Sequence, residues 1–338
     1  MRKELLRIQD LSIGYGKGKR QSVVNKRLNG CINSEELVCL LGENGAGKST
    51  LIRTICGFQP ALGGEINMQN KNVLKLSEKE LALMASVVLT DRIVVPNATV
   101  EEMVSLGRSP HTGTMGILSR EDKKKVEAAI VQCRIDHKKK EYLTNMSDGE
   151  KQKVFIAKAL AQDTPLIILD EPTAFLDLPA RVETIQLLRT IASESGKSIL
   201  MSTHDLDLAL QLADRLWLMG KEKPLIQGSP EDLLLQNEFQ HIFQRKGIEF
   251  DNETCSFKVD NAFAVTLPVQ ANGFEFRLLQ RAFARKGVNV VPVDKKHDDY
   301  LNVVDNQGKP FELIKEGNIV VKEESVEKLV DATMAFLN

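Results

Sequence analysis

The sequence predicts an α/β protein with a parallel sheet at its centre, followed by a small α+β domain. Between about residues 3 and 245, short apolar runs alternate with helical patterns, and Gly, Asp and Pro separate them. Three runs, at residues 37–41, 166–169 and 198–202, are continuously apolar rather than alternating. Continuous apolar strands are expected where helices cover both faces of a sheet, so we expect these runs to be buried.

The chain is expected to divide into residues 1–250 and residues 251–338. Residues 97–160 are helical in pattern and highly charged, which predicts a helical subdomain within the first domain. After residue 250 the sequence predicts short strands, a helix that ends near Gly287 and a hairpin around residues 305–309. A last helix is expected to bury one apolar stripe, formed by Val326, Leu329, Val330, Met334 and Leu337.

Composition indicates a protein of ordinary globular type without a strong overall charge. The 45 basic and 46 acidic side chains give a net charge of -1, so no global field attracts nucleic acid or anionic lipid. Five cysteines without a C-x-x-C pair fit a reducing compartment. No run of about 18 apolar residues and no secretion signal is present. Work at a membrane would therefore require docking onto another protein.

A phosphate-binding motif directly follows the first buried strand. Its residues fit G-x-x-x-x-G-K-[ST] at every fixed position: Gly42, Glu43, Asn44, Gly45, Ala46, Gly47, Lys48 and Ser49, with Thr50 next. Glycines let backbone N–H groups surround phosphate oxygens, and the following helix directs its positive end at the anion. Lys48 is assigned to the β- and γ-phosphates and Ser49 to Mg²⁺. The alternative, a Gly-rich turn before a helix, is disfavoured because both strand and helix flank the motif.

Two carboxylates end the second buried strand. Asp170 suits Mg²⁺, directly or through water, and Glu171 is expected on the other face of the strand as the general base for the attacking water. Ligands of parallel sheets bind at this end of the strands. Acids that merely cap a strand are the alternative, and the upstream phosphate motif disfavours it.

Residues 146–150 read Met-Ser-Asp-Gly-Glu before a segment of high helix propensity. Ser147 and Glu150 also satisfy the S-x-x-E capping box, so a well-capped helix without further function is an equal alternative on these residues alone.

The order of these motifs resembles that of the ABC ATPase family over roughly residues 3–245. The motifs follow one another in this order: a phosphate loop, a helical insertion, an LSGGQ-like stretch, a strand ending in Asp-Glu and a histidine at position 204. The sequences Gly-Arg-Ser-Pro at 107–110 and Leu-Ala-Gln-Asp-Thr-Pro at 160–165 resemble ATPases that serve importers of ferric siderophores, haem or cobalamin.

The resemblance implies a head-to-tail dimer in which ATP lies between one copy's phosphate loop and the other copy's signature. Ser147 and the backbone of Gly149 are then expected to meet the γ-phosphate across the interface. Tyr15 matches the aromatic residue that stacks on adenine, with a core tyrosine as the alternative. Asp177 matches the loop that links the two sites, and His204 matches the histidine that contacts the γ-phosphate and water.

Two positions depart from the family pattern. Thr90 stands where Gln usually senses Mg²⁺ and couples to the permease, with Asp91 as a possible substitute. Asp148 replaces a glycine of the signature and adds an anion near the phosphates, which costs affinity unless it points away. From these two departures we predict that ATP hydrolysis is slow in the isolated subunit and rises with the permease.

The function expected is a peripheral ATPase at the cytoplasmic face of the membrane that uses ATP and Mg²⁺. The expected partners are a permease, a second ATPase subunit and, indirectly, a substrate-binding protein. The permease is expected to contact residues 90–111. Nucleic acid is not expected as a partner. A soluble ABC ATPase acting on ribosomes or nucleic acid is one alternative, but such proteins have tandem cassettes or long coiled coils. A P-loop kinase or GTPase is another, and no guanine-reading N-K-x-D follows.

Overall fold

The computed structural model describes residues 3–16, 20–90, 97–113, 115–243, 248–251, 255–259, 263–271, 273–293, 299–303 and 311–337. Two compact units make up the chain: Met1–Arg245 with Phe250–Phe257, and Lys246–Glu249 with Lys258–Asn338. Asp251 and residues 255–257, which the sequence analysis assigned to the second domain, therefore belong to the first unit. Each unit has a hydrophobic core of its own.

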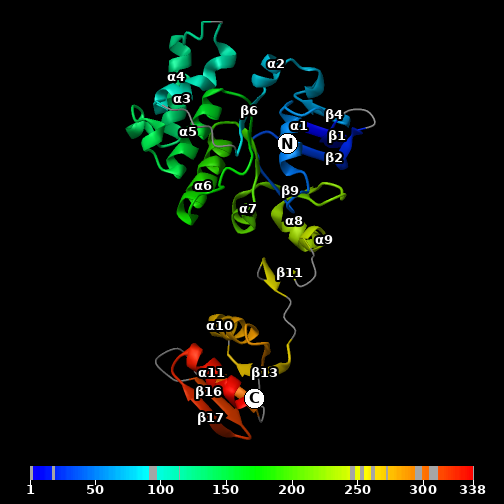
Figure 1. The fold of residues 1–338 in the computed structure, drawn as a ribbon, viewed down its shortest axis with the longest axis vertical. Coiled ribbons are helices and arrows are strands. Elements are labelled where there is room, and N and C mark those ends of the chain that lie inside the picture. The colour runs from blue at the N-terminus through cyan, green and yellow to red at the C-terminus, as the bar shows by residue number, and fades with distance from the viewer. Residues whose placement is uncertain are drawn as a thin grey trace. The chain divides into compact units, whose positions relative to one another are not determined.

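A six-stranded sheet in the order β10-β9-β3-β8-β7-β6 forms the centre of the first unit (Figure 1). Its strands are β3 (Leu37–Gly42), β6 (Ala85–Val88), β7 (Leu166–Leu169), β8 (Ser198–Ser202), β9 (Arg215–Met219) and β10 (Ile226–Gly228). All pairs are parallel except the edge pair β9–β10. Every residue of β3, β7 and β8 is buried, which confirms the three predicted central strands.

An antiparallel sheet in the order β2-β1-β4-β5 packs beside the central sheet, and the sequence analysis did not predict it. Its strands are β1 (Glu4–Tyr15), β2 (Ser22–Asn33), β4 (Gly63–Met68) and β5 (Lys71–Asn72). Apolar residues of β1 and β2 share one core with β3, with α1 (Lys48–Ile55) and with the buried Trp217 of β9. This core holds α1 against the end of β3, where the phosphate motif begins.

The other helices of the first unit cover the central sheet or form the helical segment. These are α2 (Glu78–Ala82), α3 (Val100–Ser105), α4 (Arg120–Gln132), α5 (Asp148–Ala161), α6 (Leu178–Glu194), α7 (Leu206–Leu212), α8 (Pro230–Leu235) and α9 (Glu238–Phe243), with 3₁₀ turns at Val73–Lys75, Leu106–His111, Asp136–Lys138 and Leu143–Asn145. Reciprocal capping boxes begin α2, α3, α4 and α5, which explains why these charged segments start helices where they do. Helices α3, α4 and α5 join one core with the central sheet.

A short two-stranded hairpin, β11 (Ile248–Asp251) and β12 (Ser256–Val259), follows α9. Phe250 stacks on Phe239 of α9 with ring centroids 5.0 Å apart. Phe257 meets Phe250 edge to face at 5.2 Å and Phe243 at 5.7 Å. This aromatic contact explains why Phe250 and Phe257 belong to the first unit.

The second unit is a five-stranded mixed sheet with helices α10 (Gly273–Ala284) and α11 (Val326–Leu337). Its strands, in the order β14-β13-β15-β16-β17, are β13 (Val265–Gln270), β14 (Val288–Pro292), β15 (Asp299–Val303), β16 (Phe311–Lys315) and β17 (Asn318–Glu323). The antiparallel pair β15–β16 flanks the predicted hairpin turn, which lies outside the described residues. In α11, Leu329 and Val330 are buried as predicted, but Leu337 is exposed and Thr333 is buried in the stripe.

A buried ion pair joins the 3₁₀ turn Leu106–His111 to the helices around it. Arg108 Nε donates to Asp122 Oδ1 at 2.9 Å, and its Nη1 donates to the carbonyl of Ala161 at 2.8 Å. Hydrogen bonds from Ser119 and Arg108 lower the pKa of Asp122 to about 2. The Arg108 side chain therefore connects the start of α4 and the end of α5 to residues 106–111, which belong to the segment predicted to contact a permease.

We expect Arg108→Ala to lower the free energy of unfolding by about 3 kcal/mol, because the buried carboxylate of Asp122 loses its charged partner and keeps only the hydrogen bonds from Ser119. Urea unfolding monitored by circular dichroism measures the effect. Arg120→Ala, an exposed arginine at the start of α4, is the control and should change stability by less than about 0.5 kcal/mol. Equal stability of the two variants would contradict this account of the ion pair.

No helix within the described ranges combines the length and apolar character needed to cross a bilayer.

Candidate nucleotide site

The phosphate loop connects the buried strand β3 to α1, which begins at Lys48. Gly45 and Gly47 have φ values of 78° and 104°, a left-handed region that favours glycine. A Cβ on Gly47 would also lie 2.7 Å from Val24 Cγ1. These constraints hold the loop in a tight curve at the helix N-terminus, where backbone N–H groups and the helix dipole favour an anion.

Lys48 lies over the loop rather than in solvent. Its Nζ donates to the carbonyl of Gly42 at 2.9 Å and more weakly to that of Glu43 at 3.4 Å. Burial lowers the pKa of Lys48, while Glu171 and Asp170 act in the opposite direction. The ammonium group is thus positioned near two carboxylates that follow β7, as the order of motifs predicted.

Tyr15 and Thr50 lie together beside the phosphate loop. The Tyr15 hydroxyl and Thr50 Oγ1 are 3.0 Å apart, and 48% of Tyr15 is exposed. A half-exposed ring is not a core tyrosine, so the alternative considered for this residue is wrong. Adenine stacking on Tyr15 stays a prediction.

Ser202 at the end of β8 holds the carboxylate of Asp170 and the backbone of Glu171, and the sequence analysis missed it. Its hydroxyl donates to Asp170 Oδ1 at 2.6 Å and accepts from the backbone N–H of Glu171 at 2.9 Å. Thr90 Oγ1 donates to the carbonyl of Asp170 at 2.7 Å. Ser202 was detectable in principle, because it ends a buried strand at the same edge of the sheet. Asp91, the suggested substitute for Gln, lies outside the described residues.

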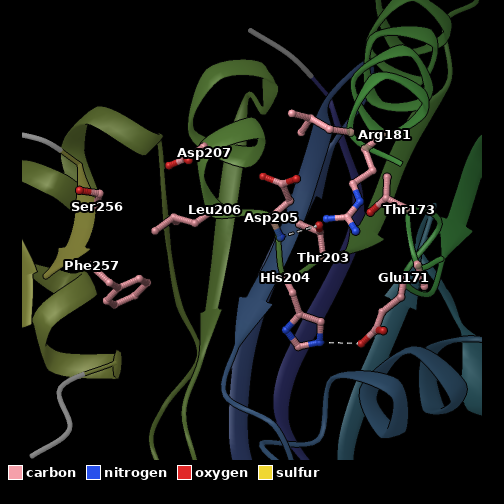
Figure 2. Close-up of a pocket in the computed structure, with 12 residues that line it drawn as sticks. Glu171, Thr173, Arg181, Thr203, His204, Asp205, Leu206, Asp207, Ser256 and Phe257 are labelled. Atoms are coloured by element: carbon pink, nitrogen blue, oxygen red, sulfur yellow. Dashed lines mark hydrogen bonds and ion pairs between the residues drawn. The ribbon is translucent and has the colours of Figure 1, made fainter. Parts of the chain in front are cut away.

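Glu171 pairs with His204 in the open part of the site (Figure 2). His204 Nε2 lies 2.8 Å from Glu171 Oε1, and both side chains remain partly exposed. Glu171 lies beyond β7 and has a left-handed φ of 49°, which is uncommon for a residue with a Cβ. This turn, rather than strand alternation, separates its side chain from that of Asp170. The structure therefore brings together the two residues predicted to act on the attacking water.

Ser147 caps α5 as its sequence predicted. Its Oγ accepts from Glu150 N at 3.3 Å and lies 3.0 Å from Glu150 Oε2, which also accepts from Ser147 N at 2.9 Å. Gly149 follows in the first turn, where a Cβ would meet that of Ala180 at 3.3 Å. The capping box is confirmed, while contact with a γ-phosphate across an interface stays a prediction.

Asp177 caps α6 by accepting a hydrogen bond from Ala180 N at 3.0 Å. The loop between Glu171 and Asp177 contains Phe175, which has a left-handed φ of 66°. The predicted linking loop is thus a tight segment fixed at one end by Glu171 and at the other by the cap of α6.

A cavity of about 570 Å³ opens at the Glu171–His204 pair. The loop before α6, the start of α7 and strand β12 surround it (Figure 2). Sequence reasoning assigned only Glu171 and His204 among its lining residues, which also include Thr173, Arg181, Thr203, Asp205, Ser256 and Phe257. The contribution of β12 had no recognisable motif.

Comparison with known proteins identifies the family. The ABC transporter family model matches residues 25–174. The petrobactin import ATP-binding protein FpuC of Bacillus anthracis is 34% identical over 237 residues, covering 70% of this chain and 85% of that protein. The chain belongs to the ABC transporter family. The iron(3+)-hydroxamate import ATP-binding protein FhuC of Bacillus subtilis is 32% identical, covering 71% of this chain and 87% of that protein.

A solved ATP-binding cassette, described as a dimeric post-hydrolysis state bound to ADP and phosphate, has a similar fold. Its TM-score is 0.58 at 25% identity, with 67% of this chain and 99% of that chain covered. The chain is thus an ATP-binding, ATP-hydrolysing subunit of an ABC transporter. These findings support transport over the soluble ABC alternative and exclude the kinase and GTPase alternatives.

We expect Ser202→Ala to lower kcat for ATP hydrolysis by roughly 10- to 100-fold, because the Asp170 carboxylate and the Glu171 backbone both lose the hydroxyl that holds them. Steady-state phosphate release measures the effect. The control is Ser198→Ala at the other end of β8, whose buried hydroxyl also makes two hydrogen bonds. Similar losses of kcat in both variants would show that strand stability, not orientation, is responsible.

Proposed function

We propose that this chain powers the import of an iron chelate by binding and hydrolysing ATP in a head-to-tail dimer on a membrane permease. The observation that carries the proposal is the convergence of Lys48, Asp170, Glu171 and His204 at the carboxyl edge of one parallel sheet. The sequence resemblance implies a substrate such as a ferric siderophore, haem or cobalamin. An external substrate-binding protein would deliver the substrate to the permease.

The nucleotide is assigned to the phosphate loop, with adenine on Tyr15 and the β- and γ-phosphates at Lys48. The exposed Ser49 hydroxyl in the first turn of α1 and the carboxylate of Asp170 provide oxygen donors that suit Mg²⁺, which keeps several waters and phosphate oxygens as ligands. Thr90 is assigned to the same ion. When bound, Mg²⁺ would neutralise charge on the phosphates.

Glu171 is proposed to accept the proton of the attacking water, whose oxygen then bonds to the γ-phosphorus as the bond to the ADP oxygen breaks. His204, held by Glu171 at 2.8 Å, would orient that water and the γ-phosphate. The second copy would supply Ser147 and Gly149 at the start of α5, and Asp177 would link the two sites. Water attack at one site thus depends on both copies.

Permease contact is assigned to residues 90–111, of which 91–96 lie outside the described residues. The names of FpuC and FhuC, which are import ATP-binding proteins for petrobactin and iron(3+)-hydroxamate, support the direction and substrate class. This placement puts the chain at the cytoplasmic face of the membrane. Thr90 and Asp148 in place of the usual residues fit slow hydrolysis by the isolated subunit that rises with the permease.

We expect Glu171→Gln to bind ATP normally but to lose about 10²- to 10⁴-fold in turnover, because the general base is removed. With ATP and Mg²⁺ it should accumulate as a dimer of the 37.7-kDa chain in analytical ultracentrifugation. Adding Lys48→Ala to the same variant removes the phosphate ligand and should keep it monomeric. Normal turnover would remove Glu171 from its role, and a monomer at saturating ATP, even beside the permease, would refute the dimer mechanism.

A further inference from the structure

The two helices of the second unit run in the same direction and form one layer. Strand β17 is parallel to β13, because β13 pairs in parallel with β15 and the next two pairs, β15–β16 and β16–β17, are both antiparallel. Helix α10 follows β13, α11 follows β17, and each packs back along the sheet. The helices contact each other and bury their apolar sides in one core (Figure 1). Their opposite sides therefore form the outer surface of one helical layer.

The outer side of α10 carries a basic stripe formed by Phe274, Arg277, Leu278, Arg281 and Arg285. These residues recur at spacings of three and four, which places them on one side of a helix. A hydrogen bond from Arg285 N to the carbonyl of Arg281 continues the turn past the end of α10. All five residues are exposed, Phe274 to 60%. Within the described part of the chain, the three guanidinium groups have no hydrogen-bond or ion-pair partner.

The outer side of α11 carries acidic side chains at a matching spacing. Glu327 and Asp331 are exposed and four residues apart, and the exposed Ala335 follows one turn later. The sequence of α11 contains one basic residue, Lys328, so the outer side of this helix is acidic on balance. The helical layer of the second unit therefore has a basic half and an acidic half.

An ion pair within one copy shows how the two halves are aligned. Lys286 Nζ, just after α10, lies 4.0 Å from Asp331 Oδ1 in the middle of α11. Arg285 is therefore at about the level of Asp331. One turn earlier, about 6 Å back along each helix, Arg281 is at about the level of Glu327. Two arginines and two carboxylates thus follow the same spacing along parallel helices.

We propose that the helical layers of two copies of this chain pair around a two-fold axis parallel to the helices, with α10 of one copy over α11 of the other. Such an axis keeps each residue at its level, so Arg285 meets the partner's Asp331 and Arg281 meets the partner's Glu327. Two-fold symmetry makes each contact occur twice. Phe274 and Leu278 add apolar surface to the same stripe.

A second copy fits this surface better than nucleic acid or an anionic membrane does. Both of these are negative throughout, so they would attract α10 but repel Glu327 and Asp331 in the same layer. Pairing α10 with α10 would oppose arginines with arginines, which favours the arrangement of α10 over α11.

This contact uses no residue of the phosphate loop or the signature, so it needs no nucleotide. Its consequence for transport rests on the proposed function. A contact between the second units would hold two ATPase subunits at a high effective concentration while their nucleotide sites are open.

The test uses the full chain without nucleotide, so that association through ATP plays no part. Sedimentation equilibrium should show a reversible dimer of the 37.7-kDa chain that weakens as salt is added. Arg281→Glu replaces attraction by repulsion at two contacts and should raise the dissociation constant by roughly 10- to 100-fold. Adding Glu327→Arg to this variant exchanges the charges and should restore most of the affinity. Arg120→Glu, at an exposed arginine of the first unit, is the control and should leave the constant unchanged.

A nucleotide-free chain that stays monomeric up to its solubility limit would overturn the inference. A dimer that Arg281→Glu does not weaken, or that the charge exchange does not restore, would overturn it as well. If the monomeric chain instead sediments with phosphatidylglycerol vesicles and Arg281→Glu does not, the basic stripe binds a membrane surface and the inference is wrong. A salt-sensitive dimer that the charge exchange restores supports the inference even if Glu171→Gln fails to dimerise with ATP, a failure that would refute the proposed function alone.

Discussion

The parallel pairing of β3, β7 and β8 is the constraint on which the site depends. Parallel strands end at the same edge of a sheet. The phosphate loop after β3, the carboxylates after β7 and His204 after β8 therefore meet at this edge although they are far apart in sequence. Complete burial of the three strands fixes their register. In that register the Ser202 hydroxyl at the end of β8 bonds to Asp170 Oδ1 and to Glu171 N beyond β7. A shift of one strand would separate Asp170 from Ser202 and Glu171 from His204.

Backbone strain at Glu171 is explained by what lies on either side of it. Asp170 is held by Ser202 and Thr90, and the chain must then turn so that the next carboxylate reaches His204. A left-handed conformation at Glu171 achieves this within one residue, and the hydrogen bond from Glu171 N to Ser202 Oγ supports it. Strain of this kind persists where surrounding contacts define the geometry, as they do here.

Sequence reasoning succeeded where local pattern and chemistry coincide. The central strands, the phosphate loop and the capping box at Ser147 each have a local signal that the structure confirms. It failed where position depends on long-range packing: Ser202 has no motif, and Phe257 reaches the cavity only because aromatic stacking holds a hairpin against α9. The antiparallel sheet was missed for the same reason, since its core is shared with distant strands.

The role of Ser147 as a helix cap is physically compatible with its proposed role as a γ-phosphate ligand. Its hydroxyl has one proton, which in this structure points to Glu150 Oε2, 3.0 Å away. Lys138 lies 2.6 Å from Glu150 Oε1, and the hydrogen bonds from Lys138 and then Ser147 N lower the pKa of Glu150 to about 2. Glu150 would therefore keep its charged and backbone partners if the Ser147 proton turned to a phosphate oxygen. The capping box thus holds the start of α5 in place while leaving its hydroxyl available to a ligand.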